Sequence, residues 1–257
     1  MLTAVGLASR VVTRLPDRYL VAALTAVYSR FEPELRRLPE LCPRGGTALD
    51  VGAWYGPWSA RMARRADRVV AFEATPRIAD ILRRAAPSNV EVVAAAASDE
   101  AGEADIWVPD AAGPNGVNSL VRNATHSRAM RVPTVTVDSL GLEDVRFAKI
   151  DVEGHELPVL RGAEKTVRRW QPALFIEVES RMQPVSSIVD LLGSWGYRGW
   201  VLPGRAWLPL DRFDLVAHQR RTEHVAGRGL TKRVLWPWPR YVNSVLFLAG
   251  GARPGTA

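Results

Sequence analysis

Short apolar runs alternate with amphipathic stretches along most of the chain from residue 47 onward. The segments TALDV (47–51), RVVAFE (68–73) and NVEVVAAAA (89–97) have the length of strands and are mostly apolar, and helical patterns separate them. Such strands, joined by helices, are typical of a parallel sheet that is buried on both faces. Right-handed crossovers would then place the carboxyl ends of these strands along one edge of the sheet.

A different rhythm follows Asp99. The strand patterns DEAGEADIWVP (99–109) and VPTVTVDSL (132–140) flank a long polar loop, and long loops in compact domains are often functional. Core strands then resume at RFAKID (146–151), PALFIEVE (172–179), YRGWVL (197–202) and NSVLFLA (243–249). The pattern therefore predicts a Rossmann-like α/β domain over residues 46–250. We expect a mostly parallel, seven-stranded sheet with helices on both faces and an antiparallel last strand.

Helical patterns fill the intervals between the strands. The clearest, ELPVLRGAEKTVRRW (156–170), has its acids early and its bases late, as the helix dipole prefers. In the N-terminal segment, residues 1–45, apolar side chains such as Leu24 and Tyr28 follow a helical stripe. Charges interrupt this segment, so neither a signal peptide nor a membrane span fits. We expect N-terminal helical cover over the core; an amphipathic helix in peripheral contact with a membrane is the alternative.

Composition adds two constraints. The chain is 47% hydrophobic and 24% charged, which is the balance of a soluble globular protein. Its one cysteine, Cys42, excludes an intrachain disulfide and fits a reducing cytoplasm, where we expect the protein. The net charge is +7, but residues 46–204 carry 18 basic and 20 acidic side chains. The central part of the chain therefore lacks the basic stripe that nucleic-acid binding usually needs.

Positive charge is concentrated in the segment 205–240, which we interpret as a basic, Trp-rich insertion before the last strand. Aromatic faces beside arginines can stack on sugars or bases and hold phosphates. The same tryptophans could instead cap the edge of the sheet. Residues 251–257 follow the last strand, and we expect them to be a disordered tail.

A glycine-containing turn, DVGAWYG (50–56), is the first candidate for ligand binding. A strand runs into Gly52 and a helix begins after Gly56, and glycine lets backbone N–H groups approach a ligand closely. The dinucleotide fingerprint G-x-G-x-x-G would need glycine where Trp54 stands, which argues against an NAD-type oxidoreductase. S-adenosylmethionine (SAM) has no pyrophosphate and tolerates a wider turn. Asp50 could hold its ammonium group.

Two further acids follow successive strands. Glu73 ends the second strand, about 21 residues after Gly52, where a carboxylate can accept hydrogen bonds from both ribose hydroxyls. Asp99 ends the third apolar run and could accept a bond from an adenine amino group, with Ser98 lining the base. Each acid alone could be an ordinary turn residue. Three acids in series at strand ends are a more specific signal.

The block KIDVEGHE (149–156) ends the strand that should lie beside the glycine turn. Methyl transfer to a hydroxyl needs alignment of the acceptor and a group that removes its proton. His155 or Asp151 could be that base, and Glu153 lies between them in the sequence. The three residues are our candidates for the catalytic group.

Other roles are open for the acids of this block. Asp151 and Glu153, with Glu177 from the following strand, could hold a divalent cation through oxygen ligands. Alternatively, Glu153 and Glu156 only favour the start of the next helix. A cation is conceivable, but we do not expect a metal site.

Taken in order, the segments DVGAWYG, VVAFEATP, AAAASDEAG, VPTVTVDSL, FAKIDVEGHELPVLRGAEKTV and PALFIEVE closely resemble the FkbM family of SAM-dependent methyltransferases. The resemblance spans roughly residues 31–200, and KIDVEGHE is its most specific part. It implies a class I methyltransferase fold, SAM as the cofactor and O-methylation of a hydroxyl on a small molecule, sugar or glycolipid. It implies cofactor contacts at Asp50, Gly52, Gly56, Glu73, Ser98 and Asp99, and acceptor contacts at His155, Asp151 and Glu153.

Two positions depart from the family pattern. Trp54 stands where the family usually has Asn, and Ala74 stands where it usually has Pro. Neither change removes a carboxylate, so the predicted activity is unaffected. The alternative function is a nucleic-acid methyltransferase or binding module that uses the basic segment 205–240.

Overall fold

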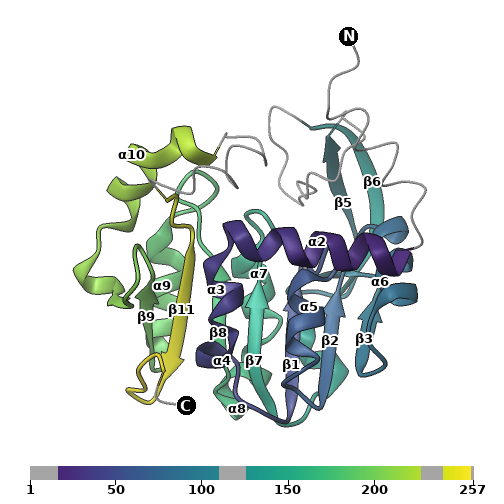
Figure 1. Cartoon of the computed structure of the whole chain (residues 1–257), viewed down its shortest axis with the longest axis horizontal. Coiled ribbons are helices and arrows are strands. Elements are labelled where there is room, and N and C mark those ends of the chain that lie inside the picture. Colours follow the sequence, from purple (N-terminus) through teal and green to yellow (C-terminus); the bar gives the residue numbers. More distant parts are fainter. Residues whose placement is uncertain (1–16, 110–125, 227–239, 256–257) are drawn as a thin grey trace.

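The computed structural model describes residues 17–109, 126–226 and 240–255. One large sheet has the strand order β10-β9-β11-β8-β7-β1-β2-β3 (Figure 1). Its strands are β1 (Thr47–Val51), β2 (Arg68–Phe72), β3 (Val90–Val93), β7 (Val145–Ile150), β8 (Ala173–Glu177), β9 (Tyr197–Val201), β10 (Leu208–Pro209) and β11 (Ser244–Ala249).

The sheet is mostly parallel. Strands β3, β2, β1, β7 and β8 pair in parallel, and β11 inserts antiparallel between β8 and β9. This confirms the Rossmann-like class I arrangement and the antiparallel last strand that the sequence predicted. The two-residue strand β10 pairs with β9 at the edge and adds an eighth strand to the predicted seven.

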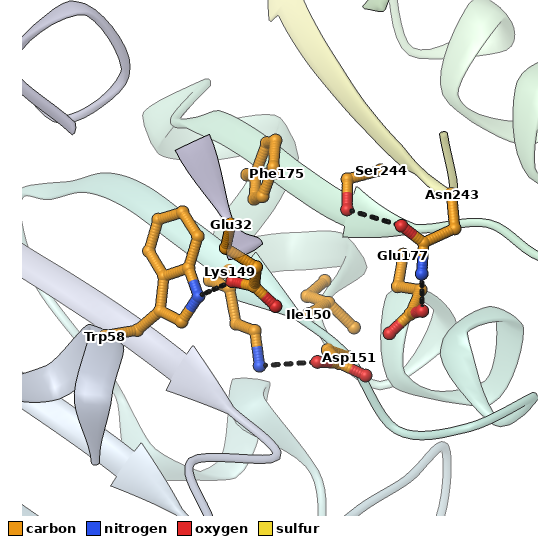
Figure 2. A pocket seen from close by; sticks show the side chains of 9 residues that line it. All are labelled: Glu32, Trp58, Lys149, Ile150, Asp151, Phe175, Glu177, Asn243 and Ser244. Carbon is orange, nitrogen blue, oxygen red and sulfur yellow. Dashed lines mark hydrogen bonds and ion pairs between the residues drawn. The ribbon is translucent and has the colours of Figure 1, made fainter. Parts of the chain in front are cut away.

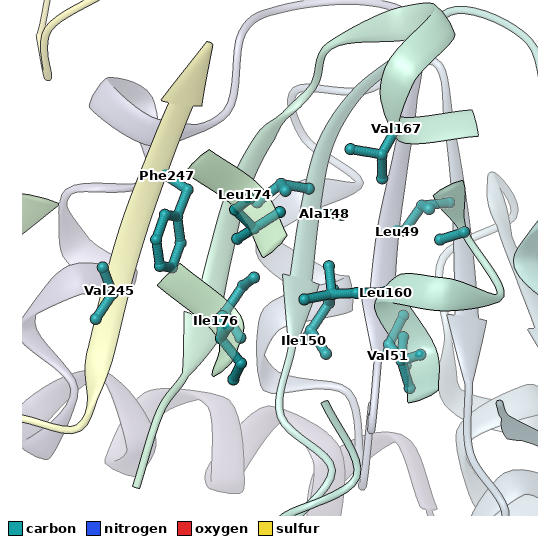
Figure 3. Close-up of a cluster of buried hydrophobic side chains, with 14 of the residues drawn as sticks. Leu49, Val51, Ala148, Ile150, Leu160, Val167, Leu174, Ile176, Val245 and Phe247 are labelled. Carbon is teal, nitrogen blue, oxygen red and sulfur yellow. The ribbon is translucent and has the colours of Figure 1, made fainter. Parts of the chain in front are cut away.

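Helices cover both faces of this sheet (Figure 1). Leu49, Ile150 and Ile176 face one side, where they pack under the helices that follow β7 and β8 (Figure 3). Trp58 and Phe147 are buried on the other side. The helices are α2 (Asp17–Phe31), α3 (Pro33–Arg36), α4 (Leu38–Leu41), α5 (Pro57–Met62), α6 (Pro76–Ala85), α7 (Glu156–Arg161), α8 (Glu164–Trp170), α9 (Val185–Ser194) and α10 (Leu215–Ala226).

A second, small sheet has the order β4-β6-β5, from β4 (Ala96–Ala97), β5 (Gly102–Pro109) and β6 (His126–Val135). The predicted third strand, 89–97, is therefore two strands, because β3 ends at Val93 and Ala96–Ala97 pair with β6 instead. Asp99 consequently follows a strand of the small sheet, and the expectation that it ends a strand of the main sheet is wrong. An unbroken apolar run does not reveal where a strand changes its pairing partner.

The predicted helix 156–170 is divided into α7 and α8. The division falls at Gly162, where a Cβ atom would lie 1.9 Å from the backbone oxygen of Ser98. The turn after β4 therefore approaches the helix so closely that only glycine fits at this position. The 3₁₀ helix η1 (Val137–Leu140) likewise occupies the end of the segment that was predicted as the strand 132–140.

The N-terminal helices lie against one face and across the top of the sheet. Helix α2 passes across the carboxyl ends of the central strands (Figure 1) and joins α6 through the ion pair Asp17–Arg84, at 2.6 Å. Val21 is a buried residue of α2, and Leu24 and Tyr28 of the predicted stripe are half-buried. Within the described ranges, no helix has both the length and the apolarity to cross a membrane.

The described part of the basic segment 205–240 contains β10, the 3₁₀ helix η2 (Leu210–Arg212) and α10. Trp207 packs on the N-terminal helices, since its Nε1 donates to Glu40 Oε2 at 3.2 Å and Arg37 stacks over its ring. Trp207 is therefore engaged in packing, on the N-terminal helices, which differs from both the predicted ligand stacking and the predicted cap on the sheet edge. Residues 227–239, with Trp236 and Trp238, and the last two residues of the predicted tail lie outside the described residues. The domain boundaries and the disordered tail stay predictions.

Gly52 provides a test of this packing. Its φ is +78°, and a Cβ atom there would lie 1.8 Å from the backbone oxygen of Asp151, which cannot move without breaking the turn after β7. Gly196 has a similar φ of +84° but nothing within 4 Å of its Cβ position, so it is a matched control. We expect Gly196→Ala to cost about 1 kcal/mol of unfolding free energy for its left-handed backbone. Gly52→Ala should cost roughly 2 kcal/mol more because it also overpacks the turn. Urea unfolding measures both values, and equal losses would contradict this packing.

Candidate active site

The site is built where the ends of β1 and β7 meet. The N–H of Asp151 donates to the carbonyl of Val51 at 3.0 Å, and the Lys149 ammonium donates to the carbonyl of Gly52 at 3.1 Å. Position 52 must be glycine because its Cα lies against the backbone of Asp151. The sequence had suggested a different reason, the close approach of a ligand to the backbone. Gly56, also at positive φ, precedes α5 and packs on Leu82.

Lys149 is the buried cation of this edge. Its Nζ lies 3.0 Å from Asp151 Oδ2 and 3.9 Å from Asp50 Oδ1, and its side chain is only 7% exposed. Burial alone would lower the pKa of Lys149, but Asp151, Asp50 and Glu32 together raise it. The lysine therefore stays charged and neutralises part of the surrounding acid.

Asp50 lies beneath the glycine turn rather than on its open side. It is fully buried, and the Ser59 hydroxyl donates to its Oδ2 at 2.5 Å. Its Oδ1 has no hydrogen-bond partner within the described ranges and faces Lys149. Burial raises the pKa of Asp50, against the opposing charge of Lys149. The carboxylate thus supports the turn from below, and a direct bond to a ligand would need the turn to open.

A polar pocket lies at the ends of β7, β8 and β11 (Figure 2). The carboxyl groups of Asp151 and Glu177 are joined by a hydrogen bond, and the side-chain amide of Asn243 donates a second hydrogen bond to Glu177. Burial and the charge of Asp151 raise the pKa of Glu177 well above its usual value. Burial also opposes ionisation of Asp151, but Lys149 and the bond from Glu177 outweigh it and lower the pKa of Asp151.

The N-terminal segment contributes one wall of this pocket. Glu32 follows α2, and its Oε2 accepts a bond from Trp58 Nε1 at 2.7 Å. Burial raises the pKa of Glu32 to about 7, although Lys149 opposes the shift. The pocket therefore contains the carboxyl groups of Glu32, Asp151 and Glu177 and the amide of Asn243, which come from four separate parts of the chain. They surround Lys149, which already pairs with Asp151 and the Gly52 carbonyl.

Glu153 and Glu156 have different roles in the loop after β7. Glu156 is buried, and its Oε1 accepts bonds from the N–H groups of Val152 and Gly154, at 3.3 and 3.0 Å. It therefore shapes the loop before α7, and it also lies in the first turn of that helix, where the alternative placed an acid. Glu153 has a positive φ of 52°, and burial raises its pKa to about 8, with Asp151 adding to the shift.

Asp151, Glu153 and Glu177 each have a carboxylate oxygen within 4.8 Å of the other two, which is a geometry that could accept a cation. Two features work against one. Lys149 already lies 3.0 Å from Asp151, and burial together with the charge of Asp151 raises the pKa of Glu177 well above its usual value. Asp151 therefore already has two partners, the Lys149 ammonium and the Glu177 carboxyl group.

Glu73 lies at the end of β2, as predicted, and faces the glycine turn. Its Oε2 accepts the N–H of Trp54 at 2.9 Å and its Oε1 accepts the N–H of Thr75 at 2.7 Å. Burial raises its pKa, and the bonds from Thr75 and Trp54 oppose the shift. Trp54 has a positive φ of 51°, and its ring packs on Tyr28 of α2. Each oxygen keeps a second lone pair, so the fixed carboxylate fits a ribose diol.

His155 is bound to the predicted adenine contacts. Its Nε2 lies 3.0 Å from Ser98 Oγ, and the Ser98 hydroxyl donates to Asp99 Oδ1 at 3.0 Å. Burial lowers the pKa of His155, and Asp99 is the charged group that opposes this shift. The three predicted catalytic residues are therefore divided: Asp151 and Glu153 belong to the acidic cluster, whereas His155 belongs with Ser98 and Asp99.

The sequence did not suggest a role for five polar residues of the pocket: Glu32, Trp58, Lys149, Asn243 and Ser244. Lys149 carried a signal, since it is the one charged residue in the apolar run FAKI. Buried charges need partners, so its neighbours on adjacent strands had to be acidic. Glu32 and Asn243 reach the pocket only through the packing of distant segments, which no local pattern reveals.

These features define a class I methyltransferase fold with an acidic site at the carboxyl ends of its strands. The sequence model of the methyltransferase FkbM domain matches residues 50–198, more than half of the chain. The chain therefore belongs to the FkbM family of SAM-dependent methyltransferases. No curated protein sequence matches it significantly.

Solved structures show distant similarity. Methyltransferase FkbM from Methylobacillus flagellatus is 15% identical with a TM-score of 0.45 over 79% of this chain, and the chain spans 43% of that protein. SMU.1697c from Streptococcus mutans, solved with S-adenosylhomocysteine (SAH), is 12% identical with a TM-score of 0.42 over 69% of this chain and 92% of that one. Precorrin-6Y C5,15-methyltransferase from Geobacter metallireducens is 15% identical with a TM-score of 0.39, covering 67% of this chain and 77% of that one.

The acidic cluster predicts how stability depends on pH. Burial raises the pKa of Glu153 from 4.5 to about 8, so the folded state binds a proton there that the unfolded state releases. The unfolding free energy should therefore fall as pH rises from about 4.5 to about 8, by up to about 1.4 kcal/mol per unit for each such group. Glu153→Gln should flatten this slope, whereas Glu100→Gln, at an exposed position, should leave it unchanged. Urea unfolding across this range measures the slope, and a rise in stability with pH would contradict the assignment.

Proposed function

We propose that this protein transfers the methyl group of SAM to a hydroxyl oxygen of a small-molecule, sugar or glycolipid acceptor. The observation that carries the proposal is the meeting of β1 and β7 at Gly52 and Asp151, with Glu73 on one side and the acidic pocket on the other. A sulfonium cofactor would then lie over the turn, with its cation among carboxylates. When bound, SAM supplies an electrophilic methyl group.

The cofactor side of this edge would use the predicted residues. The Glu73 carboxylate would accept hydrogen bonds from the ribose hydroxyls, because backbone N–H groups already fix the orientation of this carboxylate. Asp99 would accept a hydrogen bond from the adenine amino group, and Ser98 would line the base. Gly52 and Gly56 would shape the turn, and Asp50 would act through it from below, since it is fully buried.

The acceptor side would use the pocket of Figure 2. Asp151 is its best candidate base, because Lys149 and Glu177 keep it ionised and its side chain is 20% exposed. An ionised carboxylate that already has two donors can still accept a proton from an acceptor hydroxyl as the methyl group is transferred. Asn243 and Ser244 add neutral polar groups, and such a lining suits a hydroxylated acceptor.

The cofactor half of the proposal is tested by Glu73→Gln. The substitution replaces one accepting oxygen by an NH₂ group, which would face the N–H of Trp54 or of Thr75 and could not accept a ribose hydroxyl. We expect SAH affinity to fall about tenfold to a hundredfold, consistent with the loss of bonds to a charged group. Isothermal titration calorimetry measures the change, with Glu143→Gln, an exposed glutamate, as the control. Tighter binding of NAD than of SAM by the unaltered protein would contradict the cofactor class.

The acceptor half is tested by Asp151→Asn. A screen of glycosides, lipids and polyketide-like alcohols with labelled SAM first identifies an acceptor that is methylated. With that acceptor, Asp151→Asn should lower kcat about a hundredfold or more while SAH still binds, because the amide keeps the shape of the side chain and an oxygen for Lys149 but cannot take up a proton. Glu164→Gln, at the surface, is the matched control, and turnover should persist in the presence of EDTA. Normal turnover of the Asn variant would remove Asp151 from the mechanism.

A further inference from the structure

His155 opens α7, and a chain of hydrogen bonds leads from it toward Asp99. The Ser98 hydroxyl has a single proton, and this proton goes to Asp99 Oδ1 at 3.0 Å. Nε2 of His155, 3.0 Å from Ser98 Oγ, must then be the protonated nitrogen and the donor. The tautomer follows from this network. The chain therefore runs from His155 through Ser98 to Asp99, and it fixes one oxygen of the Asp99 carboxylate.

A second contact holds α7 on the same turn. Gly162 ends α7, and a Cβ atom there would lie 1.9 Å from the Ser98 backbone oxygen. The carbonyl of Gly162 also accepts the N–H of Asp138, at 2.9 Å. Helix α7 is thus attached to the turn at Ser98 at both of its ends, by the His155 side chain and by the Gly162 backbone. Such an attachment defines the position of the turn better than either contact alone.

The turn at Ser98 lies beside the Glu73 loop. Ala74, the residue after Glu73, packs in the same small apolar cluster as Ala96. The N–H of Glu73 also donates to the carbonyl of Val93, at 3.1 Å. Glu73 and Asp99 are therefore presented by neighbouring loops, while Asp151 belongs to the cluster around Lys149 and Glu177.

We propose that His155 is a positioning residue for the adenine end of the cofactor site, which acts through Ser98 to orient Asp99, and that it is not the base that deprotonates the acceptor. The assignment rests on the proposed function, since it requires SAM to bind with its ribose at Glu73. Asp99 Oδ2 is then the oxygen that accepts a hydrogen bond from the 6-amino group of adenine.

Two ligands separate this role from a general structural one. SAH carries the 6-amino group, whereas S-inosylhomocysteine has a carbonyl oxygen in its place, which an oriented carboxylate repels. Isothermal titration calorimetry of the full chain gives a dissociation constant for each, and their ratio does not depend on the fraction of folded protein. The unaltered protein should prefer SAH.

His155→Ala should weaken SAH binding about tenfold and bring the ratio of the two constants close to one. Ser98→Ala should do the same, because it breaks the chain at its centre. His155→Gln, whose amide can still donate to Ser98, should restore most of the preference, and His224→Ala, at an exposed position, should have no effect.

A ratio that stays unchanged in both His155→Ala and Ser98→Ala, whether or not the two constants themselves change, would overturn the positioning role while leaving the proposed function intact. Failure of the unaltered protein to bind SAH at all would overturn the proposed function, and the positioning role with it.

Discussion

The arrangement of the whole site depends on the close approach of the turns that follow β1 and β7. Gly52 and the backbone of Asp151 are in direct contact, and the Lys149 ammonium joins them by bonding the Gly52 carbonyl and the Asp151 carboxylate. Because Lys149 is buried, its charge acts in a medium that screens it weakly, so it can hold several acids together. Without it, the carboxylates of Asp50 and Asp151 would have no ion-pair partner among the residues that the structure describes.

This contact divides the edge of the sheet into two chemically different halves. Toward β2, carboxylates accept bonds from backbone or hydroxyl donors, as Glu73 and Asp99 do, which suits recognition of ribose and adenine. Toward β8, the carboxyl groups of Asp151 and Glu177 are hydrogen-bonded to each other beside Lys149, with the pKa of Asp151 lowered and that of Glu177 raised, which suits proton transfer. A methyl donor bound over the turn would present its reactive carbon to the second half. The division thus follows from strand order, because β1 lies between β2 and β7.

The sequence predicted the sheet well, because parallel strands are buried on both faces and appear as continuous apolar runs. It also placed Glu73 correctly at the end of β2. The sequence did not reveal that the apolar run 89–97 changes its pairing partner and forms two strands, β3 and β4. It also did not reveal that the predicted helix 156–170 is broken at Gly162. Sequence spacing also grouped His155 with Asp151, although the side chains face different partners. Contributions from distant segments, such as Glu32, carried no local signal.

In the proposed complex, one ligand lies across the Gly52–Asp151 contact, with its nucleoside toward β2 and its sulfur toward β7. A crystal structure of the protein with SAH would show this arrangement. We expect the ribose hydroxyls to donate to Glu73, the adenine amino group to donate to Asp99, and the sulfur to point toward the pocket that contains Asp151. SAH bound on another face, or with its adenine in the pocket between Glu32 and Glu177, would refute the proposed complex.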